Sequence, residues 1–132
     1  MKKELFYALI FLMSFLIFGC AGPKKMYHWG DYSSSLYRCR KDATEENFLK
    51  HKQVLEKIVE ESRKEDVKVP PGVYAELGYF YFRQSKYDDA IKYFELENQI
   101  YPKSEIFMQR LTQAARDRNK DIEKKTDPPK KD

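Results

Sequence analysis

Residue patterns that commonly mark catalytic or metal-binding chemistry are scarce in this 132-residue sequence. It has only two cysteines and two histidines, without a CxxC pair or a Cys–His cluster, so we expect no metal site. Its five glycines form no loop of the kind that holds phosphate groups. No nucleophile has a histidine partner at a recognisable spacing, and His28 and His51 are interpreted as a tether residue and a helix-surface residue. We therefore expect no catalytic residues and no enzymatic activity.

A strong charge of one sign is also missing. The net charge is only +4, and basic residues alternate with acidic ones along most of the chain. A nucleic-acid-binding protein would instead concentrate Lys and Arg on one face, so we expect no nucleic-acid partner. The length suits a single domain, which excludes a multidomain enzyme or a multi-pass membrane protein.

One long apolar run is present, and it lies near the start of the chain. Lys2 and Lys3 precede an apolar segment of 14 residues from Leu5 to Phe18, as in the n-region and h-region of a secretory signal. As a helix this run would span about 21 Å, which is shorter than a bilayer core of about 30 Å. We therefore predict a signal peptide over residues 1–19.

The apolar run ends in Ile17-Phe18-Gly19-Cys20, which resembles a bacterial lipobox. The small Gly19 would let a peptidase cleave before Cys20, whose thiol would carry a diacylglyceryl lipid, with no other cofactor expected. Such a lipid anchors a protein to a membrane, and Ala21 at the next position favours the periplasmic face of the outer membrane. Residues 20–28 would form a tether. The alternative is an ordinary signal peptide with a chance cysteine.

Cys39 is the second cysteine, and a lipid on Cys20 would leave it without an intramolecular partner. We favour the interpretation of Cys39 as a small buried residue on a helix. The alternative is that Cys39 forms an intermolecular disulfide.

A single helical repeat is the clearest internal pattern, between Pro71 and Ser104. Seven positions match the tetratricopeptide (TPR) pattern in register: Tyr74, Leu77, Gly78, Tyr81, Ala90, Phe94 and Pro102. Gly78 and Ala90 are small where two antiparallel helices would approach closely, whereas Glu97 stands where a small alanine is usual. Pro71 suits the first position of one helix, and Pro102 would end the other.

One repeat cannot bury its own apolar faces, so flanking helices must cover it. Apolar spacing predicts helices over residues 32–40 and 43–64, the second with Asp42 and Glu45 as a capping box. A capping helix would run from Glu105 to about Arg118 with Ser104 as its N-cap. The expected fold is all-α, with about five helices in a domain of residues 29–119 and a disordered charged tail over 120–132.

Aromatic side chains of the repeat suggest a binding groove. Tyr79, Phe82 and Arg83 occupy positions that face the concave surface of TPR arrays, whereas the Lys and Asn of the family's carboxylate clamp are absent. The groove could be filled internally, by Trp29, Tyr32, Leu36 and Tyr37, or by a partner segment that uses Tyr79, Phe82, Arg83 and Trp29. We favour the internal occupant, which would leave the outer helix faces to partners.

Several motifs together resemble an uncharacterised family of small bacterial outer-membrane lipoproteins, a domain family of unknown function. They are Gly19-Cys20, YHWGDY (27–32), Leu36-Tyr37, VPPGVYAELG (69–78), Ala90-Ile91 and YPKS (101–104). The resemblance implies a lipoprotein with one TPR-like hairpin, and members often accompany outer-membrane lipoproteins of the curli-secretion-channel type. We therefore expect a lipid-anchored interaction or scaffold module that serves an envelope assembly or secretion complex. The alternatives are a structural subunit of a homo-oligomer, and a ligand-binding or enzymatic envelope protein without a recognisable motif.

Overall fold

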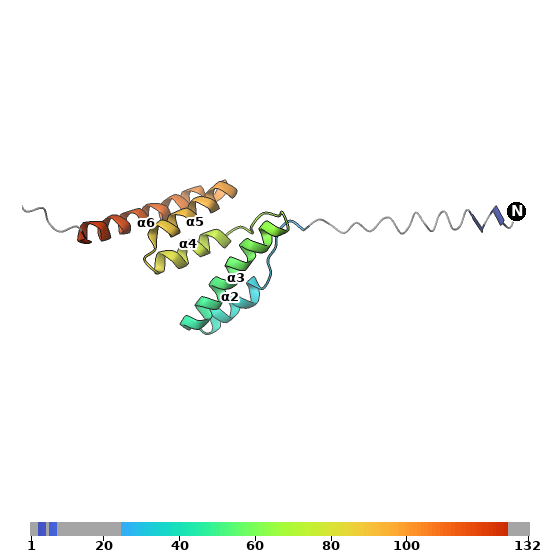
Figure 1. Ribbon diagram of the computed structural model, residues 1–132, viewed down its shortest axis with the longest axis horizontal. Coiled ribbons are helices and arrows are strands. Elements are labelled where there is room, and N and C mark those ends of the chain that lie inside the picture. The colour runs from blue at the N-terminus through green and yellow to red at the C-terminus, as the bar shows by residue number, and fades with distance from the viewer. Residues whose placement is uncertain (1–2, 5, 8–24, 127–132) are drawn as a thin grey trace, which may run out of the picture.

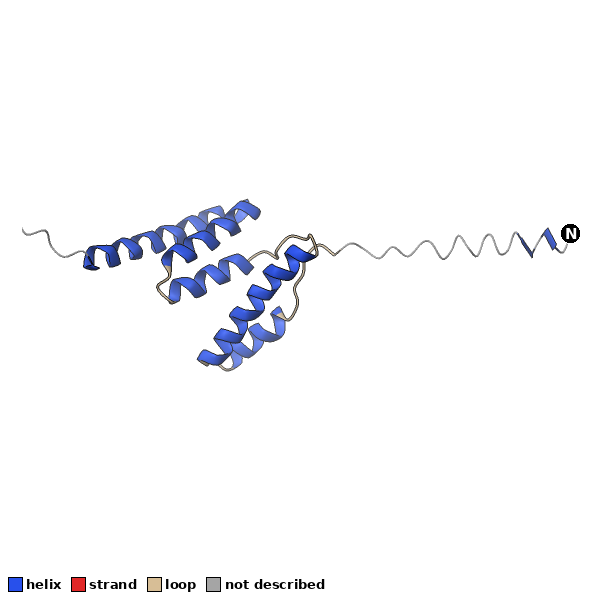
Figure 2. Cartoon of the chain, in the orientation of Figure 1, coloured by secondary structure: helices blue, strands red, loops and turns tan. Residues whose placement is uncertain are grey.

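The computed structural model describes residues 3–4, 6–7 and 25–126. Its main part is an all-α bundle (Figures 1 and 2). Within residues 25–126 the helices are α2 (Tyr32–Lys41), α3 (Glu45–Lys64), α4 (Val73–Arg83), α5 (Tyr87–Ile100) and α6 (Glu105–Thr126), with a 3-10 turn η1 (Pro102–Ser104) before α6. This confirms the predicted all-α class and the five helices. In the same residues, no helix is both apolar and long enough to cross a bilayer. Apart from residues 3–4 and 6–7, the predicted signal peptide lies outside the described residues, as do Gly19 and Cys20.

The helices follow one another in antiparallel pairs, because the connections between them are short (Figure 1). Helix α2 packs on α3, α3 on α4, α4 on α5 and α5 on α6. The starts of α2, α4 and α6 therefore lie at one end of the bundle with the ends of α3 and α5. We call this the entry end, because the chain enters the bundle there at residue 25, and we call the opposite end, at residues 41–45 and 83–87, the distal end.

The entry end holds residues that the sequence assigned to the tether. Tyr27 forms an isolated parallel bridge with Lys68, and His28 Nδ1 lies 2.9 Å from Glu65 Oε1. The bundle thus already includes residues 27 and 28. His28 pairs with a side chain of the α3–α4 connection, which differs from its interpretation as a tether residue.

Helix α3 begins two residues later than the predicted 43. Thr44 is its N-cap, and the Thr44 hydroxyl accepts a hydrogen bond from the backbone N–H of Asn47 at 3.3 Å. The predicted cap at Asp42 is wrong, because Asp42 lies outside the helix, where its carboxylate and carbonyl accept from the Asn47 side chain.

The start of α4 explains why Glu97 departs from the repeat pattern. Gly72 is the N-cap with a φ of 90°, a left-handed conformation that favours glycine, and Pro71 precedes the helix instead of starting it. Because Gly72 has no side chain, it cannot cap the helix itself. The buried Glu97 of α5 replaces that cap, since its Oε1 accepts from the Gly72 N–H at 2.8 Å. Burial raises the pKa of the Glu97 carboxyl, although backbone N–H groups at the start of α4 act in the opposite direction.

The hairpin of α4 and α5 has the predicted close approach at Gly78. A Cβ at this position would lie 2.5 Å from Phe94 Cε1 and 3.1 Å from the Ala90 carbonyl oxygen. Two clusters form the core around this hairpin. One joins α3 to α4 through Leu55, Ile58, Val69, Val73, Tyr74 and Leu77, and the other joins α5 to α6 through Ala90, Phe94 and Met108.

Helix α6 is longer than predicted. It runs to Thr126 and not to about Arg118, so the expectation of disorder is wrong for residues 120–126, while residues 127–132 lie outside the described part. Two contacts with α5 hold its second half: Arg116 pairs with Glu95 at 3.1 Å, and Asn119 donates to Asp88 at 3.0 Å. Ser104 does not cap α6, because its hydroxyl donates to the Tyr101 carbonyl within η1.

Candidate binding groove between α2 and α4

An apolar groove lies toward the distal end, where the last turns of α2 and α4 and the first turns of α3 meet. Its main pocket has a volume of about 430 Å³. The apolar walls are Leu36 and Cys39 from α2, Phe48 from α3, and Tyr79 and Phe80 from α4. A smaller hollow of about 130 Å³ adjoins it and shares Phe48 and Phe80 as lining residues. We call the main pocket the α2–α4 groove.

Two guanidinium groups line the same groove, Arg40 from α2 and Arg83 from α4. Neither forms an ion pair with any residue that the structure describes. The Arg83 guanidinium lies 4.8 Å from the centre of the Phe48 ring, a cation–π contact that orients it. Guanidinium groups bind carboxylates strongly through paired hydrogen bonds. The groove therefore combines an apolar interior with donors for an anion.

A polar network joins the three helices, and two of its members, His51 and Glu76, also line the groove. Ser35 Oγ lies 2.8 Å from His51 Nδ1, and His51 Nε2 lies 3.0 Å from Glu76 Oε2. The hydroxyl of Tyr32 donates to Glu76 Oε1 at 2.7 Å. Residues of α2, α3 and α4 are thus connected by hydrogen bonds, which fixes the walls of the groove relative to one another.

Glu76 is an ionised acceptor at the centre of this network. Burial by itself would raise the pKa of the Glu76 carboxyl, but hydrogen bonds from His51 and Tyr32 and the positive charge of Arg40 outweigh it, so the pKa lies below its usual value. The same burial raises the pKa of the Tyr32 hydroxyl, and its hydrogen bond to Glu76 adds to the effect. The Tyr32 hydroxyl therefore stays a hydrogen-bond donor at any physiological pH.

The order serine, histidine and carboxylate is also that of a hydrolytic triad, but Ser35 does not reach solvent. Its exposed fraction is 2%, and its hydroxyl also lies within hydrogen-bond distance of the Tyr32 carbonyl, at 2.9 Å. A nucleophile must meet its substrate, and Ser35 lies on the inner face of α2. The arrangement therefore positions His51 and Glu76 and does not present a serine for catalysis.

This network does not follow from the interpretation of His51 as a helix-surface residue. That interpretation is wrong, since His51 is only 3% exposed. The burial of His51 is consistent with the spacing of residues along α3. The residues that follow three-and-four steps form one face, which packs on α2 and α4: Phe48, His51, Leu55, Ile58 and Ser62. A buried histidine needs partners for both ring nitrogens, so its burial implies a polar network around it.

Cys39 is buried on α2, as predicted. Burial raises the pKa of its thiol, which keeps the sulfur protonated and unreactive. In this fold the thiol is only 6% exposed, at the wall of the α2–α4 groove, which disfavours the intermolecular disulfide.

The four predicted partner-binding residues do not lie together. Tyr79 and Arg83 line the α2–α4 groove. Phe82 packs on the opposite side of α4, against the cluster shared by α5 and α6. Trp29 lies at the entry end, edge-on to Tyr27 and Tyr32.

The prediction that the protein's own N-terminal segment fills the groove is wrong in part. Leu36 forms a wall of the groove and Tyr32 packs against the core, but Trp29 and Tyr37 are exposed. The reason is that α2 lies beside α3, so its N-terminal residues stay at the entry end.

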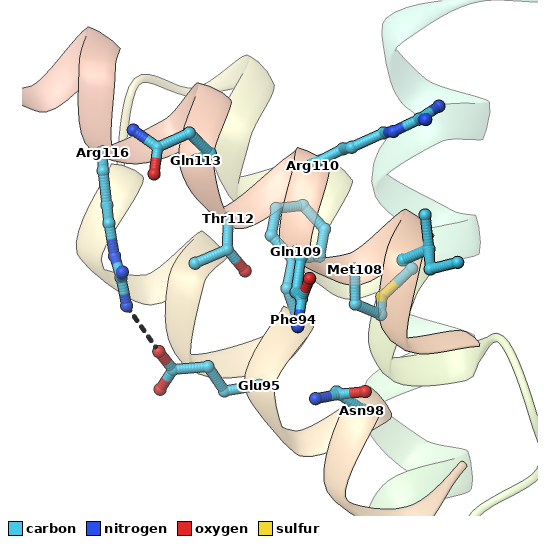
Figure 3. A pocket seen from close by; sticks show the side chains of 10 residues that line it. Phe94, Glu95, Asn98, Met108, Gln109, Arg110, Thr112, Gln113 and Arg116 are labelled. Atoms are coloured by element: carbon cyan, nitrogen blue, oxygen red, sulfur yellow. Dashed lines mark hydrogen bonds and ion pairs between the residues drawn. The ribbon is translucent and has the colours of Figure 1, made fainter. Parts of the chain in front are cut away.

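A second hollow, of about 560 Å³, lies between α5 and α6 (Figure 3). Glu95 and Arg116 point toward each other and pair at 3.1 Å, and Gln113 donates to Asp117 at 2.8 Å, whereas the buried Oδ1 of Asn98 accepts no hydrogen bond from the described residues. Because the α2–α4 groove has apolar walls and two guanidinium groups without an ion-pair partner among the described residues, we take it as the better candidate site.

The family described as "Domain of unknown function (DUF4810)" matches residues 26–111. The match includes the entry end, the α2–α4 groove and the α4–α5 hairpin, and it ends within α6. No curated protein and no solved structure matches the chain.

Proposed function

The chain belongs to the DUF4810 family, whose description states no activity, and from the α2–α4 groove we propose a non-catalytic protein–protein interaction module of the bacterial envelope. The observation that carries the proposal is an apolar pocket lined by two guanidinium groups without an ion-pair partner in the described part of the chain. Pockets of this size take a large side chain or a small ligand. A partner segment would insert an aliphatic or aromatic side chain beside Tyr79, with a neighbouring carboxylate on Arg40 and Arg83.

The α4–α5 hairpin is interpreted as a TPR-like repeat. Seven matching positions in register support this, together with the close approach of Gly78 to Phe94. On this interpretation α2 and α4 are the first helices of successive pairs, and such helices line the concave surface that binds partners in TPR arrays. The partners would be other envelope proteins, such as outer-membrane lipoproteins.

A lipid on Cys20 would hold the module at the periplasmic face of the outer membrane. The proposal rests on the apolar run, on Gly19 before Cys20 and on Ala21 after it. Cys20→Ala should leave an unprocessed precursor that incorporates no radiolabelled palmitate. Unchanged labelling of the variant would contradict the anchor.

The groove can be tested by photo-crosslinking in cells, with a photoreactive amino acid in place of Tyr79. The matched control carries the same amino acid in place of Lys92, an exposed residue of α5. We expect crosslinks to a different protein from position 79 alone, identified by mass spectrometry, and their loss when Arg83→Glu reverses one charge in the groove. Self-crosslinks alone would favour a homo-oligomer, and equal adducts from both positions would contradict a specific groove.

A further inference from the structure

Large apolar side chains are exposed at the entry end of the bundle. The exposed fractions are 71% for Met26, 43% for Trp29, 70% for Ile106 and 59% for Phe107. A single exposed apolar residue is ordinary, but several at one end of a small domain mark a contact surface. We call these four residues the entry-end patch.

Contacts between three chain segments place this patch at one end. Tyr27 bridges to Lys68, and the hydroxyl of Tyr101 donates to the Val69 carbonyl at 2.6 Å. Tyr27 and Tyr101 therefore both adjoin the α3–α4 connection, and α6 begins four residues after Tyr101, at Glu105. In Figure 1 the light-blue segment that leads into α2 starts at this same end, where α6 begins.

The stretch of chain between the entry-end patch and the proposed lipid is short. Met26 lies six positions after Cys20, and an extended chain of that length spans about 20 Å. A lipid on Cys20 would therefore hold the entry end near the bilayer. Tryptophan is enriched at the boundary between headgroups and acyl chains, and Trp29 belongs to the patch.

Charges at this end do not favour anionic lipids. Lys25, Lys68 and Lys103 are interspersed with Asp31, Glu65, Asp66 and Glu105. A membrane contact here would depend on apolar insertion and not on net charge.

We propose that the entry-end patch inserts into the headgroup region of the phospholipid bilayer and fixes the orientation of the domain on the membrane. The inference rests on the lipid anchor proposed above. Because the α2–α4 groove lies toward the distal end, this orientation directs the groove away from the bilayer, where a partner can reach it. The entry-end patch is thus a second binding surface, and its contact with the bilayer orients the α2–α4 groove.

The test uses Trp29 as a reporter, since it is the only tryptophan of the chain. The full chain is purified from bacterial membranes and reconstituted into vesicles of phosphatidylethanolamine and phosphatidylglycerol. Interfacial segments lie about 5–10 Å into the headgroup and acyl boundary, so phospholipids brominated near the top of the acyl chain should quench Trp29 and its emission should shift to the blue. Replacing phosphatidylglycerol by more phosphatidylethanolamine should change the quenching little.

A matched control moves the reporter to the distal end, as Trp29→Phe with Leu49→Trp. Leu49 is exposed near the start of α3, and a tryptophan there should show neither blue shift nor quenching. Replacing Ile106 and Phe107 together by serine should reduce the quenching of Trp29, with circular dichroism to verify the fold. Equal quenching at positions 29 and 49, or none at either, would overturn the proposal. A blue shift of Trp29 without quenching would also overturn it, because a protein surface would then cover the patch.

Mass spectrometry of the N-terminal peptide separates this inference from the anchor itself. If Cys20 carries no lipid, the anchor proposal fails. Trp29 quenching above that of position 49 would still support the patch, because the uncleaved apolar run of residues 5–18 would keep the chain on the vesicles. If Cys20 carries lipid but Trp29 is not quenched, the anchor stands and the patch proposal is wrong.

Discussion

Gly78→Ala adds one methyl group at the place where α4 and α5 are closest. The new Cβ would lie 2.5 Å from Cε1 and 2.6 Å from Cδ1 of Phe94, whereas carbon atoms in contact are about 3.5–4.0 Å apart. Phe94 is fully buried, so its ring cannot turn away into solvent. Relief of the overlap requires the two helices to separate.

The expected magnitude is the balance of two effects. Alanine is favoured over glycine in a helix by about 1 kcal/mol, whereas overpacking a core costs about 1–3 kcal/mol and occasionally more. An overlap of about 1 Å at two ring atoms belongs at the upper end of that range. We therefore expect a net loss of about 2 kcal/mol in the free energy of unfolding, and a fall in Tm of about 10 °C for a domain of this size.

Urea and thermal unfolding of Gly78→Ala, followed by far-ultraviolet circular dichroism, measure this loss. A double-mutant cycle with Phe94→Leu isolates its cause, since leucine removes the ring atoms that the methyl group meets. The double variant should be clearly more stable than the sum of the two single losses predicts. A rise in Tm for Gly78→Ala, or strict additivity in the cycle, would refute the proposed contact.

Three further predictions concern polar and aromatic residues. The pKa of Glu76 is lowered by the fold, so its contribution is present above the ordinary glutamate pKa of about 4.3 and is lost as the pH falls. The wild type should therefore be more stable than Glu76→Gln by an amount that shrinks from about pH 7 to about pH 3, as measured by urea unfolding. A difference in the free energy of unfolding that stays constant over this range would contradict the prediction. Glu97→Ala should lose about 0.5–2 kcal/mol at neutral pH, as the loss of an N-cap does, and Glu97→Gln should lose less because it keeps an acceptor for Gly72. Trp29→Ala should lower the free energy of unfolding by only about 0.5–1.5 kcal/mol, the value of edge-on aromatic contacts. A much larger loss would indicate that Trp29 belongs to the core.

The helical layout could be predicted from the sequence because its determinants are local. The spacing of Phe48, Leu55 and Ile58 indicates α3, and the turn at residues 84–86 indicates the hairpin. The small Gly78 indicates a close helix contact. Each of these features depends on residues within one or two helical turns of one another.

The candidate groove could be predicted only in part. Repeat position placed Tyr79 and Arg83 on its surface, but Arg40 and Phe48 belong to helices without the repeat signature. Phe82, at a position that lines the groove in TPR arrays, instead packs toward α5 and α6. The rotation of α4 against both neighbours decides which of its side chains face the groove, and the repeat pattern does not encode that angle for a single unit.

By itself, the sequence determined the helix class, the approximate helix bounds and the small residue at the α4–α5 contact, because helical periodicity and turn residues act over short distances. Only the tertiary structure decided that Glu97 caps α4 and that His51 connects Ser35 to Glu76. It also placed the apolar side chains of residues 26 and 106 at one end of the bundle. The physical reason is that these contacts join residues far apart in the chain, and their geometry exists only once the helices have docked at particular angles.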